Sequence, residues 1–140
     1  MKQLFALSVL GLGAALVVSA CGGNESTTGP DEHDPARVTW IVDGDTLTGD
    51  TLYLPAGQVV TVRGIFYNFS DSSLDDVEGQ HWSKLTFVPG TLATAAVDVA
   101  HHYSHTVTVS NAAATGTVDV GFGHDSLADE HTLHSPVVIQ

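Results

Sequence analysis

The sequence predicts an all-β domain, an antiparallel β-sandwich of immunoglobulin-like architecture, with a small β-barrel as the alternative. Three observations lead to this fold class. Apolar and polar residues alternate with the period of two that is typical of strands, turn-forming residues interrupt this pattern about every ten residues, and no amphipathic helix longer than a turn or two is present. The cysteine, tryptophan and cysteine spacing of antibody domains is missing, so the likeness is architectural.

Each predicted strand is a short run of β-branched, aromatic or aliphatic residues that ends at a turn signal. Residues 37–42 end at Asp43-Gly44-Asp45, and residues 51–54 end at Pro55-Ala56-Gly57. The run 59–69 carries apolar side chains on both faces, which is typical of a central strand. The predicted strands are residues 37–42, 46–48, 51–54, 59–69, 81–88, 95–100, 103–110, 116–122 and 135–140.

The N-terminus has the order of features found in a secretion signal. Lys2 supplies a positive charge, and the run from Leu4 to Val18 is almost wholly apolar but shorter than the roughly 20 residues that a membrane-spanning helix needs. Val18-Ser19-Ala20-Cys21 resembles the lipobox of bacterial lipoproteins. The resemblance implies that Cys21 is acylated on sulfur and becomes the first residue of the mature protein. The alternative is a conventional signal peptide cut after Ala20, which would leave a free thiol.

The resemblance also bears on location and on domain limits. In the lipoprotein family an aspartate after the cysteine tends to retain a protein in the inner membrane, so Gly22 favours the outer membrane if the organism has one. Residues 21–35 are rich in Gly, Ser, Thr, Pro and acidic residues, which predicts a flexible tether. The folded domain is then residues 36–140, and it contains no second cysteine for a disulfide.

The charge of the chain excludes one class of partner. Asp and Glu number 16 against 4 Lys and Arg, a formal net charge of −12, and cleavage after Ala20 would also remove Lys2. Nucleic-acid binding needs the opposite balance. Attraction to anionic lipids is disfavoured for the same reason, so the acyl anchor is the expected membrane contact.

The 8 histidines are the main chemical signal in the sequence. Neutral imidazole binds zinc and copper, so a transition-metal site is one hypothesis. Spacing argues against it: in a straight strand His101 and His105 lie about 13 Å apart and His102 points to the opposite face. A turn there, or a cross-strand partner such as His124, would be needed to assemble ligands. The candidate metal ligands are His101, His102, His105, His124, His131 and His134.

A binding surface is the other hypothesis. Trp82, next to His81 after a polar loop, is the candidate for an exposed anchor because tryptophan is enriched at binding hot spots, with a core tryptophan as the alternative. No Gly-x-Ser-x-Gly elbow, no His-Glu-x-x-His motif and no thiolate for blue copper is present in the domain.

The sequence therefore predicts a non-enzymatic, lipid-anchored envelope protein without a required cofactor. Its β-sandwich would act as an interaction module, with an unidentified protein partner, as in an accessory subunit of a larger membrane complex. The alternative is a periplasmic, histidine-rich protein that binds a transition metal, zinc or copper.

Overall fold

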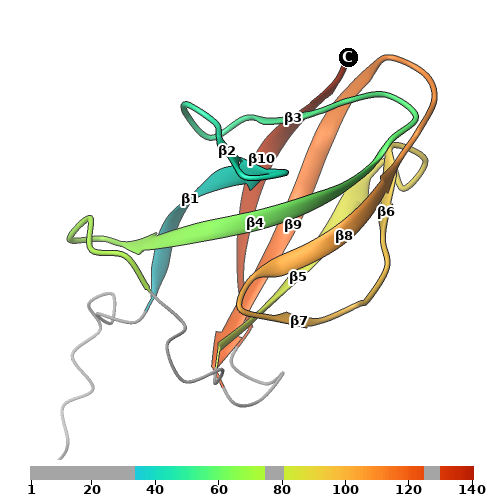
Figure 1. Ribbon diagram of the computed structural model, residues 1–140. Coiled ribbons are helices and arrows are strands. Elements are labelled where there is room, and N and C mark those ends of the chain that lie inside the picture. Colours follow the sequence, from blue (N-terminus) through green and yellow to red (C-terminus); the bar gives the residue numbers. More distant parts are fainter. Residues whose placement is uncertain (1–33, 75–80, 125–129) are drawn as a thin grey trace, which may run out of the picture.

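The computed structural model describes residues 34–74, 81–124 and 130–140, and these residues form a β-sandwich (Figure 1). Cys21, the signal and lipobox predictions and residues 21–33 of the predicted tether lie outside the described residues, whereas Pro35, the last residue of that predicted tether, is the first residue of a strand. No helix that is long and apolar enough to span a membrane occurs in the described part of the chain. The all-β prediction is confirmed.

The described strands form two five-stranded sheets that pack face to face. One sheet has the order β2-β1-β4-β8-β6 and is called sheet A here, and the other has the order β3-β10-β9-β5-β7 and is called sheet B. In Figure 1, β1, β4 and β8 cross in front of β5, β9 and β10. The strands are β1 (Pro35–Val42), β2 (Asp45–Thr46), β3 (Leu52–Leu54), β4 (Val59–Asn68), β5 (His81–Val88), β6 (Ala93–Ala95), β7 (Ala100–His101), β8 (Ser104–Val109), β9 (Ala114–His124) and β10 (His131–Ile139).

The strand order is that of an immunoglobulin-like sandwich. Strands β1, β4, β8 and β6 take the order A, B, E, D of that architecture, and β10, β9 and β5 take the order G, F, C. One pairing differs from the antiparallel prediction, because β3 pairs in parallel with β10. The segment 95–100 is not one strand as predicted, since it contributes to two short ones, β6 in sheet A and β7 in sheet B.

The core lies between the two sheets and follows directly from the alternation in the sequence. Along β8, His105, Val107 and Val109 are buried while Ser104, Thr106 and Thr108 are exposed. Three aromatic rings gather near one end of the core: Phe66 lies 4.8 Å from Tyr103 and 4.9 Å from Phe122, measured between ring centroids. The largest fully buried apolar side chains are Trp40, Phe66, Phe122, Leu52, Leu54, Ile139, Val60, Val62, Val107, Val118 and Val120.

Two buried polar links cross the core from sheet to sheet. The Trp40 indole Nε1 donates to Ser135 Oγ at 2.9 Å and to the Asp50 carbonyl at 3.1 Å, and the Ser135 hydroxyl donates to the same carbonyl. The second link joins Ser83 Oγ and His105 Nε2 at 2.9 Å. These hydrogen bonds hold β1 to β10 and β5 to β8. The other ring nitrogen of His105, Nδ1, is buried and has no hydrogen-bond partner among the described residues.

Turn chemistry fixes the ends of the strands. Asp43 and Gly44 have φ values of 49° and 95°, as the two-residue hairpin turn between β1 and β2 requires. The carboxylate of Asp43 accepts a hydrogen bond from the Thr61 backbone N–H at 2.7 Å, so this aspartate is part of the turn.

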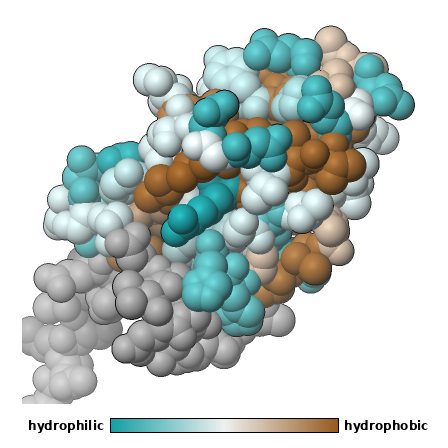
Figure 2. All heavy atoms as spheres, viewed as in Figure 1, coloured by the Kyte–Doolittle hydropathy of each residue, from teal (hydrophilic) through white to brown (hydrophobic). Residues whose placement is uncertain are grey.

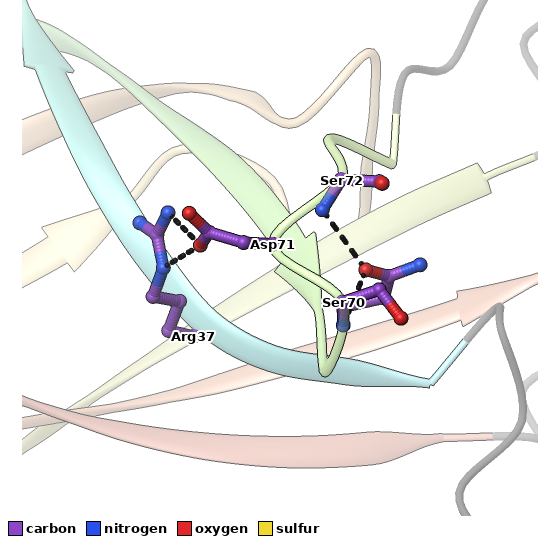
Figure 3. A network of polar contacts seen from close by, with 5 residues as sticks. Arg37, Ser70, Asp71 and Ser72 are labelled. Atoms are coloured by element: carbon purple, nitrogen blue, oxygen red, sulfur yellow. Dashed lines mark hydrogen bonds and ion pairs between the residues drawn. The ribbon is translucent and has the colours of Figure 1, made fainter.

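A second polar network braces the chain after β4 (Figure 3). Arg37 Nε donates to the Asp71 carboxylate at 2.8 Å, and the Arg37 guanidinium lies 3.7 Å from the centre of the Tyr67 ring. Asn68 Oδ1 accepts hydrogen bonds from the backbone N–H groups of Ser70 and Ser72, each at 3.0 Å. The turn that follows β4 is therefore held against β1.

Candidate functional site

The topology brings histidines that are far apart in the sequence to one end of the sandwich. His81 begins β5 and lies directly opposite His124, which ends β9. His131 begins β10 and is opposite Phe122, two residues before His124. His101 ends β7 and is opposite Trp82. Four strands thus each have a terminal histidine at the same end of the sandwich. The period of the strands alone did not indicate this.

His81 is half-buried at this end and closes the aromatic part of the core. Its ring stacks on Phe122 with centroids 5.4 Å apart and an interplanar angle of 27°, and it lies 6.3 Å from the Tyr103 ring. The imidazole is therefore held in a defined position by a ring from β9 and by the residue before β8. For His124 the structure gives the backbone position, and its side chain lies outside the described part.

The group His101 to His105 is not a straight strand, contrary to the assumption behind the 13 Å spacing. His102 and Tyr103 have φ values of 56° and 57°, so the chain turns there as it passes from sheet B to sheet A. His101 and His102 are exposed, whereas His105 points into the core. The turn does not bring the three imidazoles to one place. The cross-strand partner of His124 is His81, and no residue of the group 101–105 is paired with it.

His105 is 1% exposed and hydrogen-bonded to Ser83. Burial lowers the pKa of His105 below its usual 6.5, and backbone groups of Ser83 and Val97 partly oppose this effect. A buried imidazole with a lowered pKa is neutral at pH 7. Because Ser83 is also 1% exposed, this serine and histidine are enclosed in the core and have no solvent-accessible face for a substrate.

Two further histidines of β10 each have a carboxylate partner. His134 Nδ1 lies 2.8 Å from Asp119 Oδ1 across the β9–β10 pair, and His131 Nε2 lies 3.3 Å from Asp34 Oδ1. The five candidate ligands whose side chains are described thus do not share one environment: His101 and His102 are exposed, His105 is buried, and His131 and His134 each contact a different carboxylate. Among the described residues, no three His, Cys, Asp or Glu side chains are grouped closely enough to hold a metal ion.

Trp82 is not an exposed anchor, because only 3% of its surface is accessible. It lies outside the main core cluster, and its ring packs over Gly123 on the neighbouring strand. A Cβ atom at position 123 would lie 2.2 Å from the Trp82 ring, so the absence of a side chain there makes room for the indole. Of the two alternatives for Trp82, an exposed anchor and a core tryptophan, the burial of the side chain supports the second.

A surface that the sequence did not reveal lies on the open side of the sandwich, between the edges of the two sheets. β7 covers only Trp82 and Ser83 of β5, so Lys84–Val88 have no neighbouring strand on that side among the described residues. A groove of about 290 Å³ runs along this edge. Its lining comes from β5, β6 and the segment after β6: Leu85, Thr86, Phe87, Gly90, Ala93, Thr94, Ala95, Val97 and Asp98.

Among the described residues, two of the five large hydrophobic side chains that are exposed, Val88 and Val97, lie at this side. Large hydrophobic residues that the structure leaves exposed are few and scattered, and on the face seen in Figure 2 hydrophobic atoms lie among hydrophilic ones. Val97, which lines the groove, is 50% exposed, and Val88, at the end of β5, is 47% exposed. The sequence signal for this groove is the run Ala93-Thr94-Ala95-Ala96, whose small side chains leave space opposite β5.

The comparisons with known proteins do not assign a family. No protein-family model matches the chain, and no curated protein matches it. Among solved structures, the chain is similar to one described as the crystal structure of the S-layer protein SbsC domains 4 and 5, with 13% identity and a TM-score of 0.36. The match covers 71% of this chain and 53% of that chain, so it spans about half of the S-layer fragment. A likeness at this level carries no argument about function.

Proposed function

We propose that this chain is a non-enzymatic, lipid-anchored protein of the cell envelope whose β-sandwich binds a protein partner. The observation that carries the proposal is the open side of the sandwich, where β5 has an unpaired edge from Lys84 to Val88 next to a groove lined by both apolar and polar residues. Exposed strand edges are sites of association, and most proteins keep them short or covered. The other three edge strands, β2, β3 and β6, are also short and leave parts of β1, β10 and β8 without a neighbouring strand among the described residues, so the groove beside β5 is what distinguishes its edge.

The N-terminal residues supply the other half of the proposal. The charge, apolar run and Val18-Ser19-Ala20-Cys21 sequence favour export and acylation of Cys21, and the segment 21–35 would let the domain stand away from the membrane. A tethered domain with an open edge suits an accessory subunit of a larger membrane complex. Ser83 and His105, which are hydrogen-bonded to each other, are enclosed in the core away from any substrate, which supports a binding role over a catalytic one.

Crosslinking from defined positions in intact cells tests this proposal. A photoreactive amino acid at Thr86, which is exposed on β5, should give a crosslinked product with a membrane-associated protein, while the same group at Thr61, exposed on β4, should not. In parallel, Cys21→Ala should leave the protein unacylated and uncut. Equal crosslinking from both positions, or normal processing and membrane association of Cys21→Ala, would contradict the proposal.

A metal-binding function is the second candidate, and the pairing of β5 with β9 favours it. His81 and His124 are paired residues on neighbouring strands. Two imidazoles together with water or a further ligand can hold zinc or copper. If so, zinc at a hundredfold excess over Kd should stabilise the fold by about 2.7 kcal/mol.

The test of the second candidate is a thermal melt with and without zinc. The stabilisation should disappear in His81→Ala and His124→Ala but remain in His134→Ala, whose partner is Asp119. It should also weaken below the ordinary histidine pKa of about 6.5, since protonated imidazole does not bind metal. An unchanged melting temperature with zinc would exclude this function.

A further inference from the structure

The unpaired edge of β5 offers hydrogen-bonding groups in the geometry of a sheet. Lys84–Val88 continue the β5–β9 ladder, in which each residue has a partner from Gly121 to Thr117. In such a strand every second residue directs its backbone N–H and C=O away from the paired neighbour. On the side away from β9, these groups have no strand to bond among the residues the structure describes. This edge can therefore accept one more strand in sheet B.

The groove beside this edge can receive the side chains of an added strand. Leu85 and Phe87 of β5 are only 8% and 5% exposed and face the core, and Ala93 and Ala95 of β6 line the groove with them. The methyl side chains of the two alanines leave the space open. Because side chains of a strand alternate between faces, every second residue of an added strand would enter the groove while the others remained in solvent.

Charge favours one kind of occupant. The chain has a formal net charge of −12, and the groove carries Asp98, whose side chain is 80% exposed. The Lys84 ammonium lies 3.7 Å from the Asp98 carboxylate, and such an exposed pair is weak and easily exchanged. A second copy of this chain would bring the same large negative charge to the edge. A segment that carries lysine or arginine would be attracted instead.

We infer that the open edge of β5 binds an extended, basic segment of a partner protein, which adds as a strand next to Lys84–Val88 and places alternate apolar side chains in the groove. This inference rests on the proposed function and names the chemistry of the partner. Main-chain hydrogen bonds to β5 would supply affinity, while the groove and Asp98 would supply specificity. An occupant of the groove would also cover Val97, which lines it.

A peptide selection tests the inference while the partner is still unidentified. The probe is a random library of displayed peptides of about nine residues, the length of a long strand, selected on the full chain purified in detergent. We expect enriched peptides to alternate apolar residues with polar ones and to carry lysine or arginine. The best peptide should slow amide hydrogen exchange in residues 84–88, and its affinity should fall with added salt.

Matched variants locate the binding of that peptide. Asp98→Lys should weaken binding about tenfold or more, whereas Asp45→Lys, the same charge change in β2, should alter it by less than about twofold. Ala95→Phe should fill the groove and abolish binding, while Ala113→Phe, in an exposed turn, should not. Circular dichroism of each variant checks that it is folded, and Asp98→Lys stands as the test if Ala95→Phe does not fold.

Three results would overturn the inference. The first is that the selection yields no binding peptide. The second is that the selected peptides lack basic residues and bind Asp98→Lys as well as the wild type. The third is that a bound peptide protects the amides of β3 or β10 from exchange and leaves those of β5 unprotected. Failure here is distinguishable from failure of the proposed function. Binders that protect another surface, together with crosslinking from Thr86 in cells, would leave the interaction module standing and remove only its basic, strand-adding partner.

Discussion

Replacing His105 by glutamine should remove a large part of the acid sensitivity of this fold. His105 is 1% exposed, and burial lowers its pKa below 6.5. The unfolded chain holds the same imidazole in water, with its ordinary pKa of about 6.5. In the pH window between these two values the unfolded state binds more protons than the folded state. The stabilising contribution of neutral His105 is therefore complete above about pH 6.5 and is lost as the pH falls below it.

The magnitude follows from the linkage of protons to folding. One proton taken up on unfolding changes the free energy of unfolding by about 1.4 kcal/mol for each pH unit. The wild-type chain should thus lose up to about 1.4 kcal/mol per unit from this residue as the pH falls below about 6.5, until the pKa of the folded state is reached. At pH 7.5 glutamine should cost about 0.5–1.5 kcal/mol, because it replaces the hydrogen bond to Ser83 imperfectly.

Urea unfolding followed by tryptophan fluorescence at pH 8, 7, 6 and 5 measures this difference. The curves for the wild type and His105→Gln should converge as the pH falls, since only the wild type loses the His105 contribution. His101→Gln is the matched control, because His101 is exposed and its replacement changes no side chain of the core. A parallel loss of stability in the wild type and His105→Gln below pH 6.5, or the same effect from His101→Gln, would show that His105 is not the source of this acid sensitivity.

Three further predictions concern packing, surface charge and the limits of the fold. Gly123→Ala should destabilise the protein by about 1–3 kcal/mol, because the new Cβ would meet the Trp82 ring at 2.2 Å. Gly121→Ala, where the nearest atom is the end of the exposed Glu130 side chain, should cost clearly less in the same denaturation assay, and equal losses would contradict this packing argument. Arg37→Ala should cost no more than about 1 kcal/mol even though Arg37 contacts Asp71 and Tyr67, since both charged side chains are largely exposed; a larger loss in urea unfolding would refute this. A fragment that begins at Asp34 should unfold cooperatively without a disulfide and give a strand-type circular dichroism spectrum, and a non-cooperative melt would show that the preceding residues are needed.

The sequence by itself determined the class of fold, because alternation is a local property of each strand. In β8 the pattern from Ser104 to Val109 indicates which side chains enter the core, and Asp43-Gly44 indicates the turn after β1. These signals are complete within a few neighbouring residues. The net charge of the chain and the signal-like and lipobox-like residues up to Cys21 could also be recognised without a structure.

Tertiary structure decided which strands are neighbours and therefore which side chains meet. His81 and His124 are opposite each other only because β5 pairs with β9, and no sequence spacing encodes that pairing. The same holds for Ser83 and His105, which come from different sheets. The burial of Trp82 has a related cause, because a glycine on the adjacent strand provides room for its ring.

The open edge of β5 likewise depended on the tertiary structure. The segment 95–100 has the composition of one strand, which would have been long enough to cover an edge, but β6 joins sheet A and β7 joins sheet B. The segment 95–100 is divided because β6 forms its hydrogen bonds with β8, whereas β7 forms its hydrogen bonds with β5. The period of the sequence pattern sets which face of a strand is buried. Which strand edge stays open depends instead on the competition between strands for backbone hydrogen bonds, and strands from the whole chain take part in that competition.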